Sequence, residues 1–218
     1  PSASDPADTA WDDRFGTISW NDMALAIAVS GTDPYVGGVF TSSAGVPVNF
    51  ILKWNGRSWL TLGSGMNGPI LALAVSGTDL YAGGIFDSAG GVAAQNIARW
   101  DGSNWSALDA GINGQVYALA ASGSDIYAGG YFSSAGGTSA NNIAKWDGSA
   151  WSALSSGVND FVFAIALLGT DVYVGGHFWI AWTDSVNHIA KWNGTNWSGL
   201  GSGLFGDDVY ALAFNGGD

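Results

Sequence analysis

The two histidines of this chain stand close together, in a segment that also holds two tryptophans. Imidazole nitrogens bind protons, metals and hydroxyl groups, and indole rings present large apolar faces on which a ring can stack. Amide and carboxylate groups beside them supply the few polar contacts that a small-ligand pocket needs. We therefore predict a ligand-binding site in this segment, formed by His177, Trp179, Trp182, Asp184, Asn187 and His188. Neighbouring loops between repeats are expected to add Phe161, Phe205, Asp207 and Asp208.

These residues are of interest because they break a pattern that the rest of the chain keeps. The position of His177 is occupied by Val39, Ile85 and Tyr131 at earlier, equally spaced places in the sequence. A unique ligand needs unique groups, whereas structural positions are shared by all repeats. The same changes also fit a hydrophobic plug, a contact between repeats or neutral drift.

Metal and catalytic chemistry find little support in the sequence. His177, His188 and Asp184 offer zinc ligands, but they lack a short defined spacing such as H-E-x-x-H, so we predict no metal site. The chain has no cysteine, no G-x-S-x-G elbow, no phosphate-binding G-x-x-x-x-G-K loop and no calcium loop. We expect no enzyme activity and no cofactor.

The elements that position the predicted site come from an internal repeat of 46 residues. Gly-Gly pairs begin at Gly37, Gly83, Gly129 and Gly175, and each step is 46, as in 83 − 37. Two tryptophans recur in each unit with the same step, at positions 54, 100, 146 and 192 and at positions 59, 105, 151 and 197. A period of this length is typical of propeller blades.

Within one unit the pattern predicts four short strands. In the third unit these are residues 116–121, 126–132, 142–146 and 151–154, with a polar loop between the second and third strands. The third and fourth strands are joined by Asp147-Gly148, which is typical of a tight hairpin. The repeated aspartates 33, 79, 125 and 171 are predicted to cap turns, and the paired tryptophans to pack between units.

We therefore predict an all-β fold, a β-propeller with four-stranded antiparallel blades. The complete 46-residue repeats span residues 23–68, 69–114, 115–160 and 161–206, within a propeller domain of residues 11–218 that follows a polar leader at 1–10. Residues 11–16 and 209–214 are expected to form a half-blade shared by the two termini. A parallel β-solenoid is the runner-up, although its coils are usually shorter and lack these hairpins. The half-blade leaves three alternatives open: a longer natural chain, completion by another chain, or closure by four blades alone.

The unit resembles the kelch-like propeller repeats of exported bacterial proteins, through its Gly-Gly element after a hydrophobic strand and its later tryptophan. The Trp-Asp pairs at 100–101 and 146–147 are similar to the WD40 signature, although here glycine follows and a hairpin begins. The resemblance implies a secreted or cell-surface protein with a binding or scaffold role. It carries no set of catalytic residues.

The charge balance narrows the class of partner. Eighteen acidic and six basic residues give a net charge of −12, which disfavours binding to a phosphate backbone. No run of about 18 apolar residues is present to span a membrane. We expect a non-enzymatic exported scaffold that binds a protein partner or associates with itself. The alternative is a lectin-like propeller that binds glycans in clefts between blades, lined by groups such as Asn96 and Asn142, or at the divergent loop of the fourth repeat.

Overall fold

The computed structural model describes residues 20–206 and 208–214. All regular structure among these residues is β, arranged as four sheets of four antiparallel strands and four small two-stranded sheets. These residues contain no helix that is long and apolar enough to cross a membrane. The predicted half-blade strand at residues 11–16 and the predicted loop residue Asp207 lie outside the described residues.

Each large sheet is one blade, and its strands follow the order first, second, third and fourth from the inside outward. Blade one consists of β1 (Ala24–Ser30), β2 (Asp33–Gly38), β5 (Ile51–Trp54) and β6 (Trp59–Leu60). Blade two consists of β7 (Ile70–Ser76), β8 (Asp79–Gly84), β11 (Ile97–Trp100) and β12 (Trp105–Ala107).

Blades three and four repeat this arrangement. They consist of β13 (Gln115–Ser122), β14 (Asp125–Tyr131), β17 (Ile143–Trp146) and β18 (Trp151–Ala153), then β19 (Val162–Leu168), β20 (Asp171–Gly176), β23 (Ile189–Trp192) and β24 (Trp197–Gly199). The predicted strands of the third unit are therefore confirmed to within one or two residues.

The segment between the second and third strands of every blade, predicted as a polar loop, holds a small hairpin. The four hairpins are β3 (Ser42–Ser43) with β4 (Val46–Pro47), β9 (Ser88–Ala89) with β10 (Val92–Ala93), β15 (Ser134–Ala135) with β16 (Thr138–Ser139), and β21 (Ile180–Ala181) with β22 (Asp184–Ser185). One asparagine anchors each hairpin. In blade three, Asn113 Oδ1 accepts hydrogen bonds from the backbone N–H groups of Ser133 and Ser134.

The hydrophobic core lies between successive blades. Ile51 and Leu62 of blade one pack in one buried cluster with Ile70, Leu80 and Trp105 of blade two, and similar clusters join blade two to three and three to four. The second tryptophan of blades two, three and four also bonds the preceding blade: Trp105 Nε1 donates to the Leu62 carbonyl at 2.8 Å. The packing role predicted for these tryptophans is confirmed.

The Gly-Gly pair allows this close stacking. A Cβ on Gly37 would lie 2.5 Å from Ile70 Cγ2 of the next blade, and the same clash recurs at Gly83 with Val116 and at Gly129 with Val162. A Cβ on the second glycine, Gly38, would meet the Met23 carbonyl of its own blade. Glycine is therefore needed at both positions by close backbone approach.

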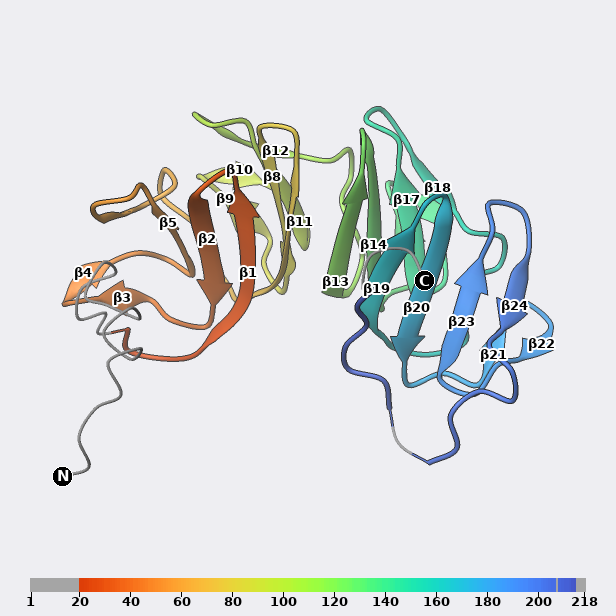
Figure 1. The fold of residues 1–218 in the computed structure, drawn as a ribbon. Helices are drawn as coiled ribbons and strands as arrows, with labels where there is room; N and C mark the ends of the chain where they lie inside the picture. Colours follow the sequence, from red (N-terminus) through yellow and green to blue (C-terminus); the bar gives the residue numbers. More distant parts are fainter. Residues whose placement is uncertain (1–19, 207, 215–218) are drawn as a thin grey trace, which may run out of the picture.

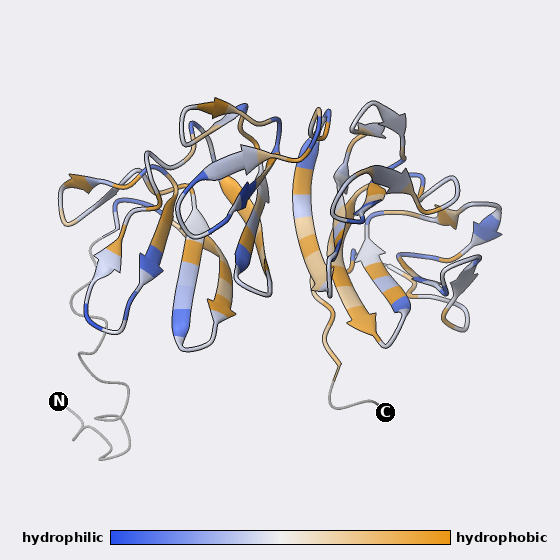
Figure 2. Cartoon of the chain, turned by 90° about the horizontal axis from the view of Figure 1, so that it is seen from above, coloured by the Kyte–Doolittle hydropathy of each residue, from blue (hydrophilic) through white to orange (hydrophobic). Residues whose placement is uncertain are grey.

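The four blades form an arc that stays open among the described residues. The blades follow one another across Figure 1 from blade one at the left to blade four at the right, with their first strands side by side in the order β1, β7, β13 and β19. These first strands are largely apolar, as ALAIAVS in β1 and ILALAVS in β7, and Figure 2 shows hydrophobic residues along the long strands of the blades. Residues 208–214 continue beyond blade four, where a fifth blade would begin.

Candidate functional site

The two histidines flank one end of a strand pair in blade four. His177 follows the last residue of β20, and His188 precedes the first residue of β23. Because Gly175 pairs with Ile189 in this ladder, the imidazole rings lie near one another, with centroids 5.9 Å apart. His188 is buried, whereas the side chain of His177 is 39% exposed.

A carboxylate from beyond blade four joins the two imidazoles. Asp208 Oδ1 is hydrogen-bonded to His177 Nδ1 and lies 3.9 Å from His188 Nδ1. Tyr210 donates its hydroxyl to Asp208 Oδ2 at 3.2 Å. The hydrogen bond with His177 lowers the pKa of Asp208, with smaller help from Tyr210 and His188. A lowered pKa stabilises the fold above the unfolded pKa of 3.8, and this gain is lost as the pH falls through the folded value.

Trp179 completes the cluster as an aromatic wall. Its ring lies 4.5 Å from the ring of His177 and 5.6 Å from that of His188, both in edge-on geometry. Its backbone N–H donates to Asn159 Oδ1, the hairpin anchor of blade four. The indole is 42% exposed, so one face of the cluster is open to solvent.

The other three predicted residues lie elsewhere. Trp182 stands in the turn between β21 and β22, where its backbone N–H donates to the Gly157 carbonyl, and its side chain lines a separate cleft. Asp184 is exposed at the start of β22. Asn187 Nδ2 donates to the Ser202 carbonyl and so holds the segment after blade four. The structure brings His177, Trp179 and His188 together and separates Trp182, Asp184 and Asn187 from them.

Asp208, one of the inter-blade loop residues predicted beside the site, is marked in the sequence by a break in the repeat step. The residues that pack on the preceding Gly-Gly pair are Ile70, Val116 and Val162 at steps of 46, but the next such residue is Val209, at a step of 209 − 162 = 47. One extra residue therefore lies just before Val209, where Asp208 stands. The place of Asp208, directly before the packing residue, is taken by Gln115 in blade three and Phe161 in blade four.

His188 also replaces a structural asparagine. In blade three, Asn142 accepts a hydrogen bond from Phe132 N–H and donates one to the Val158 carbonyl, in a left-handed backbone conformation. Asn96 has the same two roles in blade two. His188 keeps the left-handed conformation, with φ of 71°, and its Nδ1 lies 3.2 Å from the Gly176 carbonyl. Blade one carries Phe50 at this position with the same φ of 71°, so every blade keeps the left-handed conformation while the side chain varies.

The repeated aspartates have a different role from the predicted turn caps. Each carboxylate pairs with a cation on the third strand of its own blade, as Asp79 does with Arg99 at 2.7 Å. The pKa of Arg99 is raised by this hydrogen bond. The other pairs are Asp33 with Lys53, Asp125 with Lys145 and Asp171 with Lys191.

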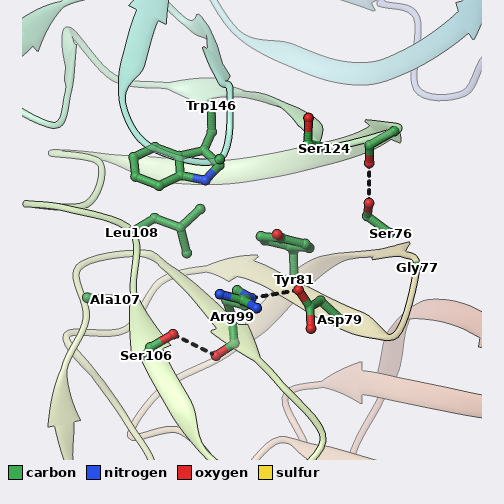
Figure 3. A pocket seen from close by; sticks show the side chains of 12 residues that line it. Ser76, Gly77, Asp79, Tyr81, Arg99, Ser106, Ala107, Leu108, Ser124 and Trp146 are labelled. Carbon is green, nitrogen blue, oxygen red and sulfur yellow. Dashed lines mark hydrogen bonds and ion pairs between the residues drawn. The ribbon is translucent and has the colours of Figure 1, made fainter.

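A larger cleft lies between blades two and three. It has a volume of about 520 Å³ and is lined by Tyr81, the Asp79–Arg99 pair and, from blade three, Trp146. Figure 3 shows Trp146 on one side of the cleft, with Tyr81 and Arg99 on the other. Its walls belong to positions that recur in every blade. The cleft is therefore a feature of the repeat, with Arg99 as its distinctive residue, since the other blades have lysine there.

The side chains of Asn96 and Asn142, predicted to line glycan clefts, are already engaged in hydrogen bonds within the protein. Both side-chain amides bond backbone groups of the protein, and Asn142 is only 6% exposed. Clefts of about 490, 360 and 330 Å³ do occur beside these asparagines. Ligand groups there would meet mainly other residues, such as Tyr131 and Trp182.

Comparison with known proteins supports the fold. No protein-family model matches the sequence, and no curated protein is similar to it at a significant level. Among solved structures, the chain is similar to the computationally designed Ika4 protein, with a TM-score of 0.53 and 16% identity, over 80% of this chain and 92% of that one. It is also similar to YCF48 bound to D1 peptide, with a TM-score of 0.51 and 11% identity, over 83% of this chain and 53% of that one. The class that fold and likeness define is a β-propeller built of tandem repeats.

Proposed function

We propose that this chain is a non-enzymatic protein-interaction module that binds a partner polypeptide at the open end of its arc. The observation that carries the proposal is the uncovered side of β1. Ile27 and Val29 are 67% and 56% exposed, whereas Leu73, the counterpart of Ile27 in blade two, is 9% exposed. Burying such side chains gives each about 1.5–3 kcal/mol, so an uncovered row favours association.

The segment 209–214 offers the second half of the binding surface. Val209 packs on Gly175 as the first strands of the other blades pack on their preceding Gly-Gly pairs, and Leu212 adds to the contact. None of the described strands pairs with this segment in a ladder. Val209 N–H already donates to the Gly176 carbonyl at 3.4 Å, and the mostly exposed residues 211–214 are where an added strand would pair.

These surfaces specify the chemistry of the partner. An extended segment with alternating apolar side chains would pair with residues 211–214 and cover Ile27 and Val29. The net charge of −12 favours basic residues in that partner and disfavours association of two like-charged copies. The similar YCF48 structure holds a peptide, which supports a polypeptide as the ligand class.

A selection experiment tests this proposal. A phage-displayed library of random short peptides is panned against the wild-type chain, and binders are measured against Ile27→Asp/Val29→Asp. We expect enriched peptides that alternate apolar and basic residues and bind the variant at least about tenfold more weakly. The control is Val92→Asp, an exposed apolar position on a hairpin, which should bind like wild type.

Two results would contradict the proposal. Equal binding to the wild type and the double variant would place the interface elsewhere. A stable dimer of the wild type in light scattering, lost in the double variant, would show that a second copy covers β1.

One observation favours a glycan as a second candidate ligand. Trp182 is 51% exposed and lines a cleft of about 360 Å³ together with Asn141 and Asn159. An open indole beside amides suits a sugar ring. A glycan array probed with wild type, Trp182→Ala and the control Val46→Ala, an exposed apolar position on the hairpin of blade one, tests it. Binding lost only in Trp182→Ala would support the glycan role, and an array without any bound glycan would refute it.

We further propose export to the cell surface or medium, as kelch-like repeats of bacterial proteins imply. The support is the resemblance of the repeat, in its Gly-Gly element and second tryptophan. Fractionation of the native source with an antibody against the chain tests this, and recovery in the cytosol alone would refute it.

A further inference from the structure

The cluster at the end of blade four holds three groups that bind d-block metal ions. We propose that His177, His188 and Asp208 form a binding site for a divalent ion of the zinc class. One ligand atom from each residue can be chosen so that all three lie within 4.8 Å of one another. Two imidazoles and one carboxylate are a common protein ligand set for zinc.

The distances fit after small side-chain movements. Zinc bonds to nitrogen and oxygen are about 2.0–2.2 Å long, which places tetrahedral ligand atoms about 3.3 Å apart. Asp208 Oδ1 already contacts His177 Nδ1 and lies 3.9 Å from His188 Nδ1. An ion between the three atoms would replace the direct hydrogen bond by three coordinate bonds.

The surroundings favour a defined site with one open position. His188 is held in place by burial, and Trp179 packs on both imidazoles. Fixed ligand rings raise metal affinity because less freedom is lost on binding. The partly exposed side chains of His177 and Asp208 leave room for a water or a ligand atom as the fourth donor.

The other blades show that the fold does not need these three groups. The counterparts of His177 are Ile85 and Tyr131, those of His188 are Asn96 and Asn142, and those of Asp208 include Gln115 and Phe161. No other group of three or more histidines and carboxylates suited to a metal is found among the described residues. The three residues that differ from their counterparts in the other blades thus lie together at one place, and packing alone does not require this.

A bound ion would connect three segments. It would join the end of β20 and the start of β23 to the residue before Val209. The ion would add a second link to the segment 209–214, whose Val209 already packs on Gly175 and donates its N–H to the Gly176 carbonyl. Metal binding would thus stabilise the folded state by mass action and slow the opening of this segment.

Zinc titration of the wild-type chain tests the proposal. Competition with a chromogenic chelator measures affinity and stoichiometry, in excess magnesium so that weak binding to the acidic surface is suppressed. Cobalt serves as a spectroscopic probe, since tetrahedral Co²⁺ with protein ligands absorbs visible light strongly. We expect one equivalent of zinc per chain and a raised midpoint of thermal unfolding.

The variants place at each position a residue that another blade already uses. His177→Tyr, His188→Asn and Asp208→Gln should each weaken zinc binding more than about tenfold while the zinc-free unfolding midpoint stays close to that of wild type. Asp184→Asn is the matched control, because it removes a nearby carboxylate outside the cluster. It should bind like wild type.

Several outcomes would overturn the site. These are no saturable zinc binding by the wild type in excess magnesium, equal binding by the three cluster variants, or an equal loss in Asp184→Asn. The zinc-free unfolding midpoint distinguishes a lost ligand from a lost fold. A cluster variant that fails to fold is replaced by His177→Phe, which removes the exposed imidazole alone and must still lower zinc affinity.

Discussion

At the scale of single residues, the hairpin turns show how one side chain organises several backbone groups. Asp147 Oδ1 accepts hydrogen bonds from the N–H groups of Ser149 and Ala150 and from the Ser149 hydroxyl. These donors, the Ala150 N–H above all, lower the pKa of Asp147 from 3.8 to about 2. Blades one and four use Asn55 and Asn193 for the same backbone bonds, which indicates that the acceptor matters more than the charge.

This turn gives a pH prediction with a built-in control. The folded pKa of Asp147 is depressed, so its stabilising effect is complete above pH 3.8 and is lost as the pH falls toward about 2. Asp147→Asn keeps the acceptor and should lose only this acid dependence. Asp147→Ala should be less stable than wild type at neutral pH, and this difference in the free energy of unfolding should shrink as the pH falls toward about 2. Urea unfolding between pH 2 and pH 6 measures both, and equal pH profiles for wild type and Asp147→Asn would contradict the assignment.

The candidate site was predictable only in part at this scale. The break in the repeat identified His177, Trp179 and His188, because a change of residue type is visible in an aligned repeat. It also included Trp182, Asp184 and Asn187, because sequence proximity does not say which side of a hairpin a side chain takes. Asp208 was predicted only as part of a neighbouring loop, because it comes from the next repeat, and the packing of residues 209–214 onto blade four places it beside the imidazoles.

At the scale of elements, the blade strands were predictable and the small hairpins were not. The long strands alternate and are bounded by Gly-rich turns, so the pattern indicates them directly. Strands of two residues, such as β15 and β16, have no period to detect. Each hairpin is anchored by an asparagine some 20 positions earlier in the chain. For Ser133 this residue is Asn113.

The hairpin anchor gives a stability prediction. Asn113→Ala removes the acceptor for the N–H groups of Ser133 and Ser134, so it should lower the free energy of unfolding by about 1–2 kcal/mol. Ser139→Ala, at an exposed position of β16, is the control and should change it by less than about 0.5 kcal/mol. Urea denaturation measures both. Equal stability of the two variants would show that the anchor does not hold the hairpin.

At the scale of the whole molecule, stability depends on how closely blades approach. Gly129→Ala places a Cβ 2.5 Å from Val162 Cγ1 of the next blade and should destabilise the fold by about 1–3 kcal/mol. Gly199→Ala is the matched control: its Cβ would find its nearest atoms at 3.6 Å, and blades two and three carry Ala107 and Ala153 there. Thermal unfolding compares them. A Gly129→Ala protein as stable as Gly199→Ala would contradict blade stacking through the glycine.

The partner surface could not be predicted from the repeat alone. Ile27 belongs to the same repeated position as Leu73, and nothing in its residue type says that it is uncovered. Its exposure follows from the arc, which leaves the outer side of β1 without a neighbouring blade among the described residues.

Hydrogen exchange read by mass spectrometry tests the central claim most directly, with the free chain compared to the chain bound to a selected peptide. Our account predicts fast exchange of residues 209–214 in the free chain, and slowing on binding in residues 209–214 and in β1. Exchange in β7 and β13, whose sides are covered by neighbouring blades, should stay unchanged. Slowing confined to other parts of the chain, with residues 23–30 and 209–214 unaffected, would contradict the claim that the open end of the propeller is its binding surface.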